Sequence, residues 1–202
     1  MDKEPLLLVG AGGHARSCID VIEAEGRFRI VGLLGLASEV GQRQCGYEVI
    51  GKDASLAELS GQYPNALIAV GQVESPEIRK RLFAVARQAG FKLPVIVSPR
   101  AHVSRHATVG EGTILMPGVI INANARLGAN CIINSQALVE HDAVVGDHCH
   151  ISTGVLLNGN VSVGNDTFIG SGNIDQLLGH IQAAVMVDAG LGDDERPVSH
   201  CP

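Results

Sequence analysis

The sequence has no tryptophan, few aromatic residues and no run of basic residues. Aromatic side chains make up 3% of the chain, and the formal net charge is −6. Proteins that bind single-stranded nucleic acid use stacking aromatics and positive patches, so we expect no nucleic-acid partner. The first residues, MDKEPLLLVGAGG, lack a basic region and a cleavage site, and their apolar run is too short to span a bilayer. We therefore expect a cytoplasmic protein without a membrane span.

Cysteine pairs and metal-ligand spacings are also missing. The five cysteines include no CxxC pair and no zinc-type spacing, so we expect them to be buried free thiols. Three histidines, His141, His148 and His150, lie close together in the sequence. No set of cysteines or carboxylates completes a metal-ligand shell around them, so no metal is expected.

The first half of the chain alternates apolar strands with helical segments. LLLVG (6–10), RIVGLL (29–34) and ALIAVG (66–71) are typical of short buried strands, and helical patterns follow the first and the last of them. Strands that alternate with helices indicate a parallel sheet. The sequence therefore predicts a small Rossmann-like α/β domain over residues 1–97.

A glycine-rich loop lies between the first strand and the first helix of this domain. Gly10, Gly12 and Ala15 fit the pattern G-x-G-x-x-A, which lets a backbone and a helix N-terminus approach an anion. A dinucleotide site would also need an acid at the end of the second strand, where Gly35 and Leu36 stand instead. This disfavours NAD. A contact to a phosphate, a nucleotide sugar or a sugar acid is favoured, and a purely structural turn is the alternative.

The second half is an internal repeat of six residues. From residue 101 to 172 the chain divides into twelve blocks such as ATVGEG, ALVEHD and AVVGDH, and the third residue of every block is Val, Ile or Leu. The first residue of every block is Ala, Thr, Val or Cys. Each block predicts a short strand plus a turn, and three blocks make one triangular coil whose core is shared with its neighbours. Gly or Asn often stands fourth in the block, where we expect the turn to need a positive φ.

These two halves together resemble the bacterial hexapeptide-repeat sugar acetyltransferases. The resemblance rests on VGAGGHAR near the N-terminus, on IINSQALVEHDAVVGDHCHIS (132–152) and on TGVLLNGNVSVGNDTFIGSG (153–172). It implies a left-handed parallel β-helix over residues 98–172, which carries the acyltransferase activity. It also implies acetyl-CoA as co-substrate and a homotrimer with the active site between adjacent helices. The last segment is most similar to the branch that O-acetylates sialic acid, as part of surface polysaccharide and lipopolysaccharide biosynthesis.

The resemblance also implies the site residues. His141 in V-E-H-D corresponds to the catalytic base, and Asp142 after it assists, although Glu140 is the other acid that could orient the imidazole. Asn134 is expected to contact the substrate. His150 and Gly170 are expected to contact acetyl-CoA. In the α/β domain, the substrate contacts are expected from Gly12, Gly13, His14 and Gly71.

Two features depart from the family pattern. Gly35 and Leu36 stand where the branch that N-acetylates nucleotide-linked amino sugars often has acids, which weakens that alternative. The repeat also stops at residue 172, because the next block would place Asp175 on the interior line, where an unpaired carboxylate is costly. We interpret residues 173–202 as an atypical tail such as a frameshift produces, which predicts weakened acetyl-CoA binding. An inactive β-helix scaffold is therefore a third possible function.

Overall fold

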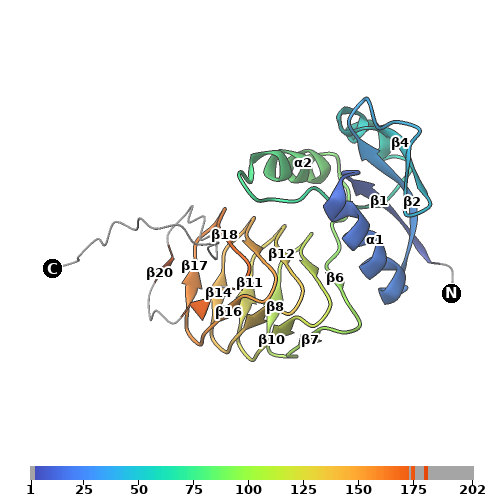
Figure 1. Ribbon diagram of the computed structural model, residues 1–202. Helices are drawn as coiled ribbons and strands as arrows, with labels where there is room; N and C mark the ends of the chain where they lie inside the picture. Colours follow the sequence, from blue (N-terminus) through green and yellow to red (C-terminus); the bar gives the residue numbers. More distant parts are fainter. Residues whose placement is uncertain (1–2, 173, 176–179, 182–202) are drawn as a thin grey trace.

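The computed structural model describes residues 3–172, 174–175 and 180–181. A small α/β domain lies against one end and one edge of a parallel β-helix, and its second helix, α2, lies along the coils (Figure 1). No helix in the described part of the chain is long and apolar enough to cross a membrane.

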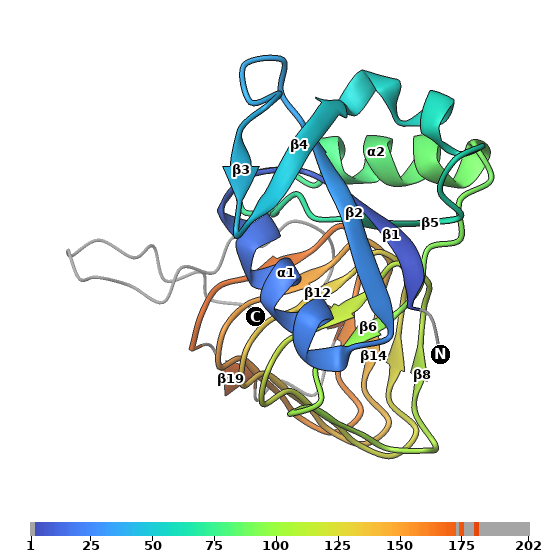
Figure 2. The same cartoon turned by 90° about the vertical axis from the view of Figure 1, so that its right-hand side faces the viewer.

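The α/β domain is a five-stranded sheet with one helix on each face. Its elements are β1 (Glu4–Val9), α1 (Gly13–Glu25), β2 (Phe28–Gly35), β3 (Arg43–Gln44), β4 (Tyr47–Lys52), the 3-10 turns η1 (Asp53–Ser55) and η2 (Ala57–Leu59), β5 (Asn65–Ile68) and α2 (Glu77–Gln88). The strand order is β3-β4-β2-β1-β5, and all neighbours are parallel except β3 and β4. Alternate residues of β1 explain the two helical layers: Leu6 and Leu8 pack with the α1 side, Leu7 and Val9 with the α2 side (Figure 2).

The central strand β1 ends at the position where ligands bind in open α/β sheets. β1 pairs with β2 on one side and β5 on the other, so the strand order reverses there and leaves a crevice at its carboxyl end. Gly10 follows β1 with φ 120°, and a Cβ on it would lie 2.9 Å from the backbone of Ala69 and Val70. Only glycine fits this position.

The β-helix consists of two-residue strands that repeat every eighteen residues. Its strands are β6 (Ile96–Val97), β7 (His102–Val103), β8 (Thr108–Val109), β9 (Ile114–Leu115), β10 (Ile120–Ile121), β11 (Arg126–Leu127), β12 (Ile132–Ile133), β13 (Leu138–Val139), β14 (Val144–Val145), β15 (His150–Ile151), β16 (Leu156–Leu157), β17 (Ser162–Val163), β18 (Phe168–Ile169), β19 (Ile174–Asp175) and β20 (His180–Ile181). They form three parallel sheets, which we name after their middle strands: the β12 sheet, the β13 sheet and the β14 sheet. Pairing is in register, as in Ile120 with Leu138.

The strand pairing extends beyond the predicted limits of 98–172 on both sides. β6 pairs with β9, so the coil begins with residues 96–97, which the sequence assigned to the end of the α/β domain. β19 pairs with β16 and β20 with β17, so the backbone continues the coil at 174–175 and 180–181 despite Asp175. The rest of residues 173–202, the segment interpreted as an atypical tail, lies outside the described residues.

The interior of the β-helix follows the predicted columns. The third-position residues from Leu115 to Ile169 are all buried, and the first two, Val103 and Val109, are partly buried against them. Small first-position residues such as Ala143 and Cys149 are also fully buried, because they share the narrow interior with the aliphatic column.

The predicted role of the fourth-position glycines is wrong. Positive φ occurs at the sixth position instead, for example at Asn124, Asp142 and Asn160. Gly128, in the fourth position, has no positive φ, but a Cβ on it would lie 2.6 Å from the Asp147 backbone nitrogen in the next coil. Glycine is needed there because the corners of successive coils stack too closely for a side chain.

Arg79 on α2 joins the two domains. It is fully buried, and its Nη1 donates to the carbonyls of Ile68 and Val70 at 2.7 and 2.8 Å, while its Nε donates to the carbonyl of Asn130 at 3.1 Å. On the surface beside it, Lys80 pairs with Asp166 at 2.8 Å. Because these contacts tie the end of β5 to one corner of the β-helix, the crevice after β1 is held against the coils.

Cysteine burial differs from the expectation at one position. Cys18, Cys131 and Cys149 are buried free thiols, but Cys45 is exposed in the turn between β3 and β4. Cys45 and Gly46, both with a positive φ, form the turn that joins these two strands, so this cysteine belongs to a surface turn and not to the core. Cys201 lies outside the described residues.

Candidate active site

His141 lies at the corner of the β-helix between β13 and β14. Its Nδ1 is 2.9 Å from Oδ2 of Asp142, and Oδ1 of Asp142 accepts from Asn124 at 3.2 Å. The bond to His141, and next the bond to Asn124, lower the pKa of Asp142, so this residue is a carboxylate that holds a proton on Nδ1. The imidazole is 65% exposed, and its Nε2 has no hydrogen-bond partner among the described residues. The arrangement orients a histidine whose outer nitrogen can take a proton.

The neighbouring coils fix this corner from both sides. Glu140, the other candidate to orient the imidazole, instead accepts from Asn122 at 2.8 Å and from the His141 backbone N–H at 3.3 Å. On the other side is Gly159, eighteen residues after His141: a Cβ on Gly159 would lie 2.8 Å from Cε1 of the imidazole. Asp142 is therefore the partner of the ring, and Gly159 provides the space for it.

His150 and Asn134 meet on the outer surface of the β12 sheet, under the α/β domain. His150 is 7% exposed, and its Nδ1 donates to the carbonyl of Gln72, which leaves the lone pair on Nε2 facing the Asn134 amide at 3.4 Å. Burial is the main cause that lowers the pKa of His150, so the ring is neutral. Gly170 follows β18 at the same corner where Asn134 follows β12, two coils further along.

The predicted substrate loop lines a cavity at the end of β1. Gly12, Gly13, His14 and Gly71 all border this cavity, whose volume is about 500 Å³. α1 begins at Gly13 with no acidic residue in its first turn, which suits an anion. Burial first, and then the Arg79 charge and His150, lower the pKa of His14 to about 3; its buried Nε2 has no partner among the described residues.

Within one chain, the predicted site residues form two separate groups. His14, Asn134 and His150 gather where the α/β domain meets the β12 sheet, whereas His141 and Asp142 lie at the corner between the β13 and β14 sheets. One chain does not bring the expected base to the expected substrate contacts.

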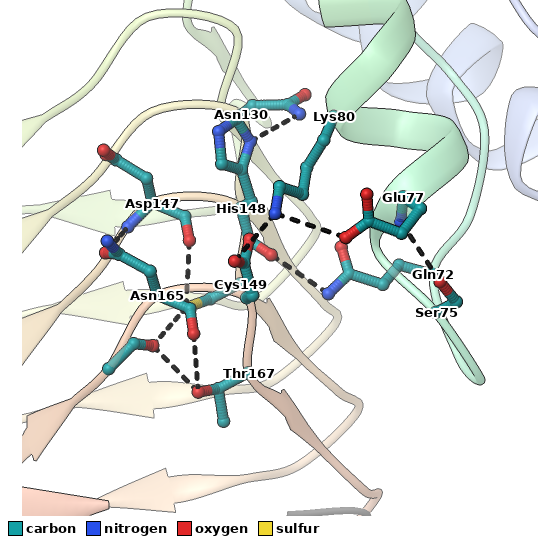
Figure 3. A network of polar contacts seen from close by, with 12 residues as sticks. Gln72, Ser75, Glu77, Lys80, Asn130, Asp147, His148, Cys149, Asn165 and Thr167 are labelled. Atoms are coloured by element: carbon teal, nitrogen blue, oxygen red, sulfur yellow. Dashed lines mark hydrogen bonds and ion pairs between the residues drawn. The ribbon is translucent and has the colours of Figure 1, made fainter. Parts of the chain in front are cut away.

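His148 belongs to neither group and packs between α2 and the coils. Its ring meets Phe83 edge-on at 5.5 Å, and Nδ1 lies 3.0 Å from the Asn130 amide. Its carbonyl accepts from the side chain of Gln72 at 3.0 Å (Figure 3). The three histidines considered as metal ligands therefore point to different parts of the molecule.

Three residues of this region were not predicted from the sequence: Gln72, Arg79 and Gly159. Gln72 and Arg79 act through contacts with segments far away in the chain, and no local pattern marks them. Gly159 had a usable signal, because a spacing of eighteen residues places it directly beside His141 in the next coil.

The comparisons with known proteins match both halves of the chain. The model of the PglD N-terminal domain matches residues 5–86, and the model of the bacterial transferase hexapeptide (six repeats) matches residues 106–141 and 124–159. The acetyltransferase domain of PglB from Neisseria gonorrhoeae, solved with acetyl coenzyme A, is 32% identical; the match covers 86% of this chain and 82% of that one, with a TM-score of 0.77.

Two further solved structures are similar. A mutant of GDP-perosamine N-acetyl transferase from Caulobacter crescentus, solved with CoA and GDP-perosamine, is 28% identical over 85% of this chain and 88% of that one, with a TM-score of 0.74. WeeI from Acinetobacter baumannii is 20% identical over 86% of this chain and 82% of that one, with a TM-score of 0.73, and shows the shared fold.

The fold and the comparisons define an acyltransferase with an α/β domain and a left-handed parallel β-helix, as the sequence predicted. The chain belongs to the bacterial hexapeptide-repeat sugar acetyltransferase family.

Proposed function

We propose that the protein transfers an acetyl group from acetyl-CoA to a sugar, with His141 as general base. The observation that carries this proposal is the exposed imidazole, fixed by Asp142 at 2.9 Å with its Nε2 open. Nε2 takes the proton of a sugar hydroxyl or amine as that group attacks the thioester carbonyl, and the Asp142 carboxylate stabilises the imidazolium. The C–S bond then breaks, and the proton passes to the CoA sulfur.

We infer that this site forms between chains of a homotrimer. The corner that bears His141 is separated from His150 within one chain, so a neighbour has to supply the second group. The outer surface of the β13 sheet also carries an apolar stripe, Ile120, Leu138 and Leu156, with Ile120 41% exposed. Packing this stripe against another copy buries it and brings the adjoining His141 corner to the neighbour, and a three-fold axis closes the assembly.

In this assembly, acetyl-CoA lies along the coils beside His150 and Gly170, while Asn134 and the glycine loop hold the sugar. The structure of the 32% identical PglB domain with acetyl coenzyme A supports this choice of acetyl donor. The intact pairing of His141 with Asp142 argues against an inactive scaffold.

Two acceptors are compatible with this chemistry. The sequence resemblance favours O-acetylation of sialic acid or a related surface-glycan sugar. The complex of the 28% identical relative with GDP-perosamine favours N-acetylation of a nucleotide-linked amino sugar. Release of free CoA with a panel of sialic acids and nucleotide amino sugars measures which class turns over.

A mixing experiment tests both the base and the assembly. His141→Ala and His150→Ala each remove one half of the proposed site, so we expect large losses of CoA release in the separate variants. In trimers formed at random from equal amounts of both, about a quarter of the sites combine an intact His141 with an intact His150 from the neighbour, so about a quarter of the activity returns. His141→Ala mixed with Asp142→Ala is the matched control: both changes affect the same corner, and no activity should return. Wild-type turnover by His141→Ala would refute the base assignment, and failure of the first mixture to recover would refute the shared site.

A further inference from the structure

The loop between β5 and α2 touches the β-helix through Gln72. Gly71 and Val73, on either side of this residue, line the cavity at the end of β1. Gln72 itself is 2% exposed, and its hydrogen bonds go to the coils of the β-helix. Successive residues of one loop therefore serve two different parts of the molecule.

Gln72 binds one coil at two points. Its backbone carbonyl accepts from Nδ1 of His150, and its side-chain Nε2 donates to the backbone carbonyl of His148 at 3.0 Å (Figure 3). A carbonyl can only accept, so the amide nitrogen of the glutamine has to face His148. Because His148 and His150 are two residues apart in the same coil, the side-chain bond fixes where the Gln72 carbonyl lies relative to the imidazole.

The other neighbours of the His150 ring leave its Nδ1 to Gln72. In the β12 sheet His150 pairs in register with Ile132 one coil before and Phe168 one coil after, and the Phe168 ring centroid is 5.1 Å from that of the imidazole. Neither side chain has a hydrogen-bonding group. Asn134 lies on the other side of the ring, where its amide is 3.4 Å from Nε2. Among the described residues, the Gln72 carbonyl therefore determines that Nδ1 carries the proton and Nε2 the lone pair.

We propose that Gln72 is a positioning residue for acetyl-CoA: its side chain anchors the loop so that its carbonyl holds His150 in the tautomer whose Nε2 accepts from an amide N–H of the co-substrate. This inference rests on the proposed function, in which His150 contacts acetyl-CoA. Gln72 does not touch the co-substrate and acts only through the imidazole. Without the side-chain bond the carbonyl can move away, and the ring can then carry its proton on Nε2, where a donor would face the donor of the co-substrate.

Gln72→Met tests this in the full-length protein without any acetyl transfer, because it removes the donor and keeps a side chain of similar length. Nitrogen NMR of the imidazoles, with the His150 signals assigned by their loss in His150→Ala, reports the tautomer. We expect the proton on Nδ1 in the wild type and a population with the proton on Nε2 in Gln72→Met. Calorimetric titration with CoA, which has the same amides, should show about tenfold weaker binding to the variant. Gln62→Met, at an exposed glutamine far from the coils, is the matched control and should keep both values.

A double-mutant cycle separates positioning from a merely structural role. If Gln72 acts through His150, Gln72→Met should weaken CoA binding no further in a His150→Ala background, whereas a structural role gives losses that add. Gln72→Ala removes the same donor with a smaller side chain and takes the place of Gln72→Met if thermal unfolding shows that the latter does not fold.

The inference is overturned if wild-type His150 carries its proton on Nε2, if the folded variant keeps the wild-type tautomer and CoA affinity, if the two losses add, or if the wild type does not bind CoA. Release of CoA with a sugar by a wild type whose tautomer does not depend on Gln72 would overturn it and leave the acetyl transfer intact. The expected changes in tautomer and CoA binding, without acetyl transfer to any sugar, would refute the proposed function alone.

Discussion

Gly159→Ala is the sharpest test of the imidazole position at the His141 corner. The added Cβ would lie 2.8 Å from Cε1 and 2.9 Å from Nε2 of His141, and both distances are shorter than a Cβ atom keeps from its neighbours in proteins. Gly159 has no positive φ, so alanine fits the backbone and the strain falls on the ring. Because Asp142 holds Nδ1, the imidazole has to tilt away from its carboxylate or the coils have to separate.

The size of the effect follows from this overlap. Moving Cε1 to an ordinary contact of 3.4 Å requires a displacement of about 0.6 Å. A misplacement of about 1 Å at a reacting group costs on the order of 100-fold, so this shift should lower kcat about tenfold, or ~1.4 kcal/mol of transition-state stabilisation. Binding of acetyl-CoA should change little, because the proposed acetyl-CoA contacts, His150 and Gly170, are not at the corner that carries Gly159.

The assay is CoA release at saturating acetyl-CoA, together with thermal unfolding. Gly61→Ala is the matched control, because a Cβ on Gly61 meets no atom within 4 Å and its φ is not positive. The control should keep both kcat and Tm. If Gly159→Ala turns over within about twofold of the wild type, the His141 ring does not act from the position described, and the reasoning fails.

Two further predictions concern stability. His14 has a pKa of about 3 in the folded protein and an ordinary value of 6.5, so the unfolded chain binds the proton first, and the free energy of unfolding should fall as the pH drops from 6.5 toward 3. Urea unfolding at pH 7.5 and pH 5 measures this fall. The fall should be smaller in His14→Gln; an equal fall in the variant and the wild type would contradict a buried neutral His14 ring. Gly128→Ala places a Cβ 2.6 Å from the Asp147 nitrogen and should cost about 2–3 kcal/mol by overpacking the corner, measured against Gly61→Ala. Equal unfolding midpoints for the two variants would show that the coils can separate there without cost.

The repeating parts of the fold could be predicted because their physical cause is local. An aliphatic side chain at every sixth residue has to point inward, and pairing across eighteen residues follows from three blocks per coil, as Ile120 and Leu138 show. The turn conformation could not be assigned from composition alone. Glycine at the fourth position answers crowding between coils, at Gly128 for instance, whereas polar residues such as Asp142 adopt the positive φ at the sixth.

The site could be predicted only where a motif is continuous in the sequence. His141 and Asp142 are neighbours, so the pairing of this histidine with a carboxylate was foreseeable, although the choice between Asp142 and Glu140 needed the structure. The contact of Gln72 with His150 joins residues 78 positions apart. Glu39 is four residues from Gly35, yet only the turn after β2 shows that its carboxylate fills the space beside that glycine. Such contacts depend on backbone geometry that no residue pattern encodes.

His14, His141 and His150 lie in different surroundings, which suit them to different roles. His14 and His150 are kept neutral by burial, and His150 is further fixed by its bond to the Gln72 carbonyl, so neither can take up a proton readily during turnover. They can orient a bound group through hydrogen bonds, without carrying charge. His141 lies on an exposed corner, where its Nδ1 is 2.9 Å from the Asp142 carboxylate. The proposed base is therefore His141, and this residue is separated in each chain from the cavity at the end of β1. The proposed trimer follows from this separation as much as from the apolar stripe on the β13 sheet.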